Sequence, residues 1–210
     1  MSKRHVMVDI ESFGPDQQNG ATVQIGAVYF DFTRDNPVVP DIALTIMGTY
    51  PSDAFPAFFE NISLSSAMNV GLKVDAEAIL WWMGKGSDAP SEQARESLWN
   101  PNPLPIRDVL KNFREFVKGA DHVWAWPVSF DLNQLRAAYQ AIGSVVPWRW
   151  RDAMDSKTYM FGVPWEHAKV EPYGIEHHAL WDACHQASRI RRGAAYKRKI
   201  THEAHEGENK

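Results

Sequence analysis

Two acidic residues near the start of the sequence have the type and spacing of a metal site. Asp9 and Glu11 end an apolar run that begins at Val6. Side chains at positions i and i+2 of a strand point to the same face, so the two carboxylates project together. Two carboxylates held close repel each other, and one takes up a proton unless a cation compensates. A strand end that turns into solvent is the simpler interpretation of an isolated Asp-x-Glu pair.

Asp131 is a third acidic residue that could bind a metal. It follows Ser129-Phe130 in the first turn of a predicted helix, after a predicted strand. A carboxylate there interacts favourably with the helix dipole, so capping of the helix is one interpretation. Because α/β folds bind ligands at the carboxyl ends of their strands, the same position also suits a binding site.

The segment 176–184 contains a histidine pair followed by an acid. His177 precedes Asp182 by five residues, which on a continuous helix places the two roughly 140° apart. They can meet only if His177 lies in the loop before the helix, and Gly174 favours such a loop. His178 stands four residues before Asp182 and is the competing choice on helix geometry. Two histidines that hydrogen-bond at a helix start are the purely structural alternative.

The elements that must position these residues follow from the hydrophobic pattern. The predicted strands cover residues 6–11, 22–32, 42–49, 122–126 and 148–153. The predicted helices lie after Asp75, over 106–117, after Ser129 and over 179–196. Residues 50–71 are predicted as loop. Early strands followed by alternating strands and helices indicate an α/β fold with a mixed sheet. We expect one domain over residues 1–200 and a polar, flexible tail over 201–210.

Composition excludes several classes of protein. The 210 residues are 44% hydrophobic and 23% charged, which fits an ordinary folded domain. No apolar stretch approaches the roughly 20 residues of a membrane helix, and we expect no signal peptide before the first strand. The single cysteine, Cys184, excludes an internal disulfide framework and suits a reducing cytoplasm, which is the expected location. The net charge of −4 gives no global sign of a polyanionic partner.

Taken in order, these residues resemble the motifs of one enzyme family. Asp9, Glu11, Asp131, His177 and Asp182 have the order and spacing of the DEDDh 3′→5′ exonucleases. The matching motifs occupy residues 8–14, 23–28, 124–131 and 177–183, within a region of resemblance that covers most of 5–196. Each motif alone is moderately specific, whereas their ordered occurrence is a strong signal.

Two further segments resemble one branch of that family. Trp81-Trp82 and Trp150-Arg151-Asp152 are similar to segments of the branch with exonuclease VIII-like enzymes, a mycobacterial type of exoribonuclease and phage DNA exonucleases. Two segments depart from it. Ala125-Trp126-Pro127 stands where the branch tends to have small residues with Asn or Gly, and Met154-Asp155 replaces an Arg-Thr-like continuation.

The resemblance implies a ribonuclease H-like α/β fold. Its sheet would be mixed and five-stranded, of order 3-2-1-4-5 with strand 2 antiparallel, and flanked by helices. Asp9, Glu11, Asp131 and Asp182 would hold two Mg²⁺ or Mn²⁺ ions about 3.5–4 Å apart. Carboxylate oxygens suit these hard ions. His177 would be the general base that takes a proton from the attacking water.

The resemblance also implies a substrate class. The partner would be DNA or RNA with a free 3′ end, and the products would be nucleoside 5′-monophosphates. Ser12 and Phe13 would contact or wedge the terminal nucleotide, and Trp81 and Arg151 are further residues expected to bind substrate. No membrane partner is expected, a homo-oligomer stays open, and a phage-encoded enzyme acting in the host cytoplasm fits the branch.

Two other features allow more than one interpretation. Trp81 and Trp82 lie off the centre of the apolar stripe of their helix. Base stacking and packing under the predicted loop 50–71 are alternatives for Trp81, whereas packing under that loop is favoured for Trp82. The basic cluster from Arg189 to Lys199 fits a solvated surface near a helix C-terminus, and phosphate binding is the alternative.

Three other functions compete with an exonuclease. A non-catalytic nucleic-acid-binding protein on the same fold would be free to lose a metal ligand, and all five positions are filled. A phosphodiesterase for small nucleotides would use the same residues. A zinc site from His177, His178, Cys184 and His185 has the right residue types, but its spacing matches no zinc motif that we know.

Overall fold

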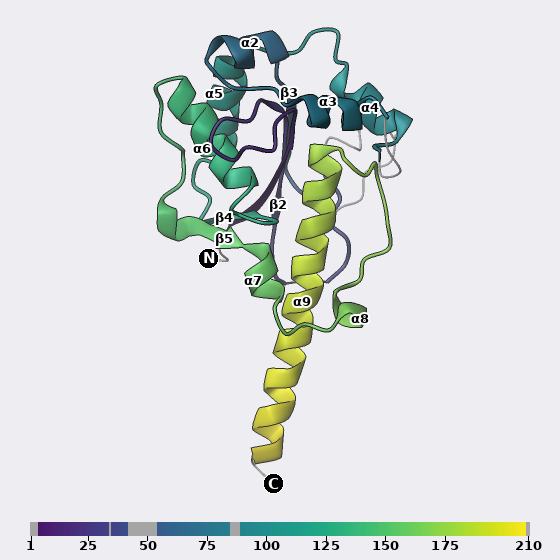
Figure 1. The fold of residues 1–210 in the computed structure, drawn as a ribbon. Coiled ribbons are helices and arrows are strands. Elements are labelled where there is room, and N and C mark those ends of the chain that lie inside the picture. The colour runs from purple at the N-terminus through teal and green to yellow at the C-terminus, as the bar shows by residue number, and fades with distance from the viewer. Residues whose placement is uncertain (1–3, 34, 42–53, 85–88, 209–210) are drawn as a thin grey trace.

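A mixed five-stranded sheet forms the centre of the molecule (Figure 1). The computed structural model describes residues 4–33, 35–41, 54–84 and 89–208. The strands are β1 (His5–Ser12), β2 (Thr22–Phe30), β3 (Ala57–Asn61), β4 (His122–Ala125) and β5 (Ala153–Asp155). Their order is β3-β2-β1-β4-β5. Since β2 is antiparallel to both neighbours and β1, β4 and β5 are parallel, the predicted order and directions are confirmed.

The third strand lies later in the chain than predicted. The predicted strand 42–49 lies outside the described residues, and β3 together with helix α2 (Leu64–Asn69) falls in the segment 50–71 that was predicted as loop. That prediction was wrong because β3 is short and follows a proline. Tertiary packing stabilises β3 instead. Phe58 packs on Phe113 on one face of the sheet, and Phe59 stacks on His178 on the other face.

The last strand also differs from the prediction. Residues Trp150–Asp152 form a single 3-10 turn, η1, and β5 begins only at Ala153. The guanidinium of Arg149 pairs with the Asp152 carboxylate, with 2.6 Å between Nε and Oδ2. This local ion pair closes the turn, so the strand starts later than its hydrophobic pattern indicates.

Helices cover both faces of the sheet. α5 (Ile106–Phe116) and α6 (Asp131–Ala141) pack on one face, where the side chains of Val6, Val8 and Ile10 lie buried. α9 (Ala179–Glu208) packs on the other face. Because strand side chains alternate, the two acids of β1 share the α9 face with Met7.

Helix α9 approaches the sheet very closely at Gly26. A Cβ atom at Gly26 would lie 2.1 Å from the backbone of Ala179 and Leu180, so only glycine leaves room for the first turn of α9. The helix continues to Glu208, whereas the sequence predicted an end near Tyr196. Figure 1 shows its second half extending past the body of the molecule.

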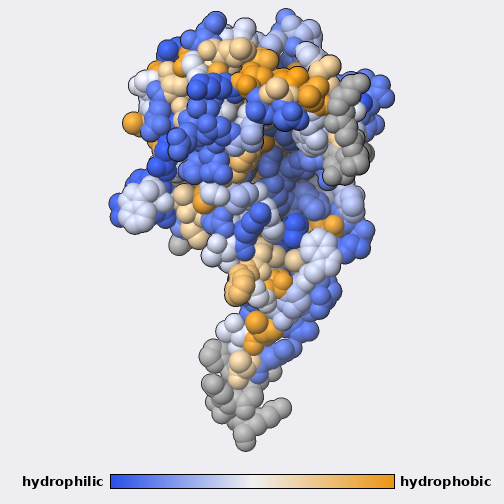
Figure 2. Space-filling view, in the orientation of Figure 1, coloured by the Kyte–Doolittle hydropathy of each residue, from blue (hydrophilic) through white to orange (hydrophobic). Residues whose placement is uncertain are grey.

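Four shorter helices complete the described part of the fold. α3 (Ala76–Trp82) begins at Asp75, whose side chain accepts a hydrogen bond from the Ala78 N–H, as predicted. α4 (Glu92–Leu98) follows it, and α7 (Ser156–Met160) and α8 (Trp165–Ala168) lie against α9. Figure 2 shows hydrophobic residues gathered along the upper edge of the molecule, where Figure 1 places α2 and α3. None of the helices in the described ranges has the length and apolarity needed to cross a membrane.

Candidate active site

The two acids of β1 lie buried beside α9. Asp9 and Glu11 are each only 9% exposed, although both would be ionised in water. Oδ1 of Asp9 accepts a hydrogen bond of 2.7 Å from the Nε2 of Gln186 on α9. Strand β1 and helix α9 therefore meet through polar groups at the end of the sheet where β1 finishes.

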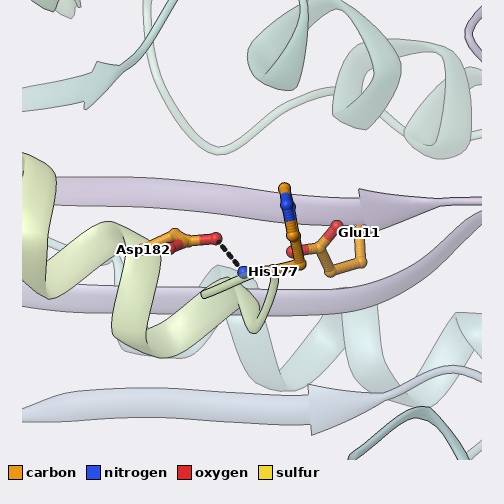
Figure 3. Close-up of side chains that lie close together, drawn as sticks. All are labelled: Glu11, His177 and Asp182. Atoms are coloured by element: carbon orange, nitrogen blue, oxygen red, sulfur yellow. Dashed lines mark hydrogen bonds between the residues drawn. The ribbon is translucent and has the colours of Figure 1, made fainter. Parts of the chain in front are cut away.

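His177 reaches these acids from the loop before α9. Its backbone has a φ of 60°, and its N–H donates a hydrogen bond of 2.9 Å to Oδ2 of Asp182 (Figure 3). Ligand atoms of Glu11, His177 and Asp182 all lie within 4.8 Å of one another. The geometric condition stated for His177, a position ahead of the helix, is met.

Gly174 shapes that loop. Its φ of 75° is in the left-handed region, and a Cβ there would lie 2.3 Å from the ring of Trp181. The loop consequently lies flat on Trp181, and the chain turns back toward β1 before α9 begins. Glycine is required here for both conformation and space.

His178 has a different environment. It is buried, and its ring stacks on Phe59 with 4.3 Å between centroids. Burial lowers the pKa of His178 to about 4, so it stays neutral in the fold. Among the described residues, the zinc ligands considered from sequence do not converge, since Cys184 lies in the core and the metal-type cluster found contains Glu11, His177 and Asp182.

Asp131 joins the cluster from the start of α6. It is 3% exposed, and its Oδ2 has no hydrogen-bond partner in the described part of the chain. Burial raises the pKa of Asp131 to about 7; interactions with backbone N–H groups oppose this, and repulsion from Asp182 adds to it. A buried carboxylate oxygen without a donor is costly unless a ligand satisfies it.

The pKa values of the four carboxylates are all raised in the fold. Burial, followed by repulsion from the other acids, raises the pKa of both Asp9 and Glu11 well above ordinary values. Burial also raises the pKa of Asp182 to about 7. No cationic side chain contributes to any of these four shifts. Oxygen-rich, mutually repelling groups without a protein cation fit a hard divalent metal ion.

Ser12 and Phe13, both predicted to contact substrate, lie just after these acids. The Ser12 hydroxyl lies within hydrogen-bond distance of the carbonyls of Gly14 and Ala21, at 2.9 and 3.1 Å, and thus holds the turn after β1. Phe13 packs edge-to-face on Trp82 at 6.2 Å. Trp82 is buried in a cluster with Phe13, Val23 and Ala94, whereas packing under the loop 50–71 was predicted, and its Nε1–H donates to the Ser12 carbonyl.

Trp81 lies between the site and the hydrophobic cluster that contains Trp82. Its ring makes an edge contact with His177, with 4.9 Å between centroids. A groove of about 360 Å³ opens beside it, lined by Glu11, Ser12, Trp82 and Phe130 among others. Trp81 is half-buried, so one part supports the histidine and another borders the groove.

Arg151 is not brought to the cluster. It is exposed in η1, just before β5, and Ala153 is level with Val123 of β4, which in turn is level with Val6. Glu11 lies at the opposite end of β1 from this level. Arg151 therefore stands at the sheet edge where the parallel strands begin, whereas α/β folds bind ligands where such strands end.

Sequence reasoning missed Gln186, which contacts Asp9 directly. A signal was available, because Gln186 follows Asp182 by four residues and therefore lies on the same face of the helix. Its amide orients a buried acid that otherwise has only like-charged neighbours.

Comparison with solved structures identifies the class of fold. The structure of E. coli ExoI bound to zinc and single-stranded DNA aligns with a TM-score of 0.52 and 14% identity, over 95% of this chain and 42% of that one. An apo exonuclease I gives 0.55 and 14%, over 93% and 44%. The exonuclease I of Methylocaldum szegediense gives 0.52 and 13%, over 90% and 40%. This chain spans less than half of each, and the fold is the ribonuclease H-like exonuclease fold.

A family model then defines the particular family. The 3′–5′ exoribonuclease Rv2179c-like domain matches residues 4–192. The chain belongs to this family of phosphodiester hydrolases. A comparison with curated proteins found no match.

Proposed function

We propose that this chain is a divalent-cation-dependent 3′→5′ exonuclease that hydrolyses the terminal phosphodiester bond of DNA or RNA and releases nucleoside 5′-monophosphates. The observation that carries the proposal is the convergence of ligand atoms from Glu11, His177 and Asp182 within 4.8 Å. Asp9 and Asp131 belong to the same charged cluster, because, in addition to burial, repulsion from Asp131, Glu11 and Asp182 raises the pKa of Asp9, and repulsion from Asp131 also raises the pKa of Glu11.

The four carboxylates would hold two Mg²⁺ or Mn²⁺ ions. The unpartnered Oδ2 of Asp131 and the raised pKa values of all four acids support this assignment. Bound there, such ions would supply Lewis acidity to the attacking water and to the leaving oxygen. Gln186 would keep Asp9 turned toward the cluster through its 2.7 Å hydrogen bond.

His177 would accept the proton of the attacking water. Histidine can take up a proton near neutral pH, which suits a general base. Two contacts fix its position: the backbone hydrogen bond to Asp182 and the edge contact with Trp81. A ring nitrogen of His177 lies within 4.8 Å of a Glu11 carboxylate oxygen, and Glu11 lines the groove, so the imidazole would reach a water held at the carboxylates.

The groove beside Trp81 would receive the terminal nucleotide. Ser12 and Trp81 line it, and Phe13 supports Trp82 at its wall. A base stacked on a tryptophan ring gains about 1–3 kcal/mol regardless of its identity. Such a contact would explain how the enzyme accepts successive nucleotides of any sequence.

Time courses on 5′-labelled DNA and RNA, single- and double-stranded, test the proposal. Each is run with Mg²⁺, Mn²⁺, Zn²⁺ or chelator. We expect a ladder that shortens from the 3′ end with Mg²⁺ or Mn²⁺ and no products with chelator or with Asp9→Ala or Asp182→Ala. A bound but undegraded strand would indicate a binding protein instead. Hydrolysis confined to dinucleotides would indicate a small-nucleotide phosphodiesterase.

A further inference from the structure

Arg189, on helix α9, lies against two tryptophan rings. Its guanidinium carbon lies 4.3 Å from the ring centroid of Trp126 and 4.8 Å from that of Trp165. Trp126 directly follows β4, and Trp165 opens α8 with 60% of its surface exposed. We call these three residues the arginine sandwich. It includes Trp126 of the segment that departs from the family pattern.

The guanidinium of Arg189 has no anionic partner in the described ranges. Its Nε is buried without a hydrogen-bond acceptor, and no hydrogen bond or ion pair joins the group to another described residue. Arg191, two residues further along α9, has such partners. It donates to the Asn36 carbonyl at 2.8 Å and pairs with Asp31 at 3.6 Å. An arginine stays charged when partly buried, so Arg189 presents an unsatisfied cation.

Contact with the two rings provides no hydrogen-bond acceptor for the guanidinium, so its N–H groups remain as its binding surface. The N–H groups point outward in the plane of the group, in a fork that matches two oxygens of a phosphate. The rings also hold that plane in one orientation, which lowers the entropy lost on binding an anion. The N–H groups of Arg189 are therefore suited to bind two oxygens of one phosphate.

The position of the sandwich relates it to the proposed active site. Arg189 follows Asp182 by seven residues, which corresponds to about 10 Å along the helix axis, and it lies one turn beyond Gln186, which contacts Asp9. No ion pair or hydrogen bond joins Arg189 to any of the four acids in the described ranges, and its Nε lacks an acceptor, so an anion from outside the protein would be needed to satisfy it.

We infer that the arginine sandwich binds a backbone phosphate of the substrate strand on the 5′ side of the scissile bond. The inference rests on the proposed function. A 3′→5′ exonuclease holds one nucleotide on the 3′ side of that bond, so any neighbouring phosphate belongs to the 5′ side. The contact is to the backbone, so it serves DNA and RNA alike and carries no base preference.

A scan of neutralised phosphates tests the inference. Single-stranded 12-mers, each with one methylphosphonate linkage at a different position, are bound with Ca²⁺ in place of Mg²⁺, and Kd is measured by fluorescence anisotropy. For the wild type, we expect neutralisation of one linkage 5′ of the terminal nucleotide to raise Kd by about ten- to a hundredfold. Arg189→Gln should bind the unmodified strand as weakly as the wild type binds the neutralised one. Neutralising that linkage should not raise the Kd of this variant further.

Matched variants separate this contact from general charge and from folding. Arg198→Gln removes a positive charge from an exposed position of the same helix and should keep the wild-type linkage profile. Arg189→Lys keeps the charge but lacks the paired N–H groups of the guanidinium, and Trp165→Ala removes one of the two rings. Each variant should show a smaller rise in Kd at the neutralised linkage than the wild type. Thermal unfolding of each variant reports whether α8 still packs on α9. The slope of log Kd against log salt should fall by about 0.7 in Arg189→Gln.

The outcomes distinguish this inference from the proposed function. If Arg189→Gln shows the same linkage profile as the wild type, the sandwich only packs α8 on α9 and the inference is overturned, whatever the hydrolysis results. If the wild type shows the expected profile but hydrolyses no strand with Mg²⁺ or Mn²⁺, the inference stands and the proposed function fails. If the wild type binds no strand, both fail.

Discussion

Two adjacent histidines at the start of α9 have opposite surroundings. His177 lies in a left-handed turn against Glu11 and Trp81, whereas His178 is stacked inside the fold on Phe59. The difference arises because the helix begins only after this pair, so helix geometry does not relate His177 to Asp182. His177 can therefore take part in chemistry at the site, whereas His178 contributes to packing.

Replacing each histidine should give different defects. His177→Ala should lower kcat by about 10²–10⁴, because the general base is lost, while Mg²⁺ still raises the melting temperature. His178→Ala should keep kcat within a few-fold and lose about 1–3 kcal/mol of unfolding free energy, since a buried stack is removed. Single-turnover hydrolysis and thermal unfolding measure the two effects. If His178→Ala were inactive and His177→Ala active, the assignment of the general base to His177 would be wrong.

The acids make the effect of metal on stability depend on pH. Their folded pKa values, about 7 for Asp131 and Asp182, are raised above ordinary values near 4, so their contribution favours folding below pH 4 and is lost as pH rises through 7. Mg²⁺ binds the ionised form. We therefore expect Mg²⁺ to raise the melting temperature more at pH 8 than at pH 5, by calorimetry.

A control isolates this effect. His178, whose pKa is lowered to about 4, loses its stabilising contribution as pH falls from 6.5 toward 4, but it does so equally with and without metal. The difference between the two melting curves removes it. In Asp131→Asn the gain from Mg²⁺ should vary less with pH, and a gain that is the same at pH 5 and pH 8 in the wild type would contradict the argument.

Individual residues were predictable where type and spacing act together. The acids and His177 were assigned because their order and spacing together resemble the motifs of one family, and the structure brings the ligand atoms of Glu11, His177 and Asp182 together. Arg151 was placed with them only by resemblance, and strand pairing puts it at the other edge of the sheet. Gln186 was overlooked because a glutamine has no pattern of its own until its partner is known.

At the scale of elements, the contact between α9 and β2 positions the site. Gly26→Ala adds one methyl group that meets the backbone of α9 at 2.1 Å and cannot be relieved by moving a side chain. We expect a loss of about 1–3 kcal/mol in unfolding free energy and a large fall in kcat, because His177 and Asp182 move with the helix. Urea unfolding and hydrolysis rates measure both.

Gly71→Ala is the matched control for Gly26→Ala. Gly71 has a φ of 97° and open space around it, so alanine there costs about 1–2 kcal/mol from backbone strain alone. It should leave kcat unchanged, since nothing in the site moves. If Gly26→Ala kept the wild-type kcat, the close approach of α9 would not position the catalytic residues.

Elements with strong periodicity were predicted, and elements that depend on tertiary contacts were not. β1, β2, α5 and α6 have apolar residues at strand or helix spacing and lie near the expected bounds. β3 was missed because five residues after a proline carry little pattern. The extension of α9 past Tyr196 was missed because its polar composition is as typical of a tail as of an exposed helix.

At the scale of the whole molecule, net negative charge should make strand binding depend on metal. The chain carries a net charge of −4, and part of this charge is concentrated in the cluster. With chelator at pH 8 we expect Kd for a single strand to rise by about tenfold or more relative to Ca²⁺, because the carboxylates then repel phosphate. Asp131→Asn should bind more tightly than wild type in chelator, and equal affinities with and without metal would contradict the prediction.

The site is assembled from parts of the chain that are far apart. Asp9 and Gln186, which touch in the fold, are separated by 177 positions, and helix α9 supplies the residues that complete the cluster. Under the proposed function, a chain still on the ribosome carries the first acids long before the histidine exists. Incomplete chains would thus be unable to hydrolyse the RNA around them, and activity would appear only after α9 has been synthesised.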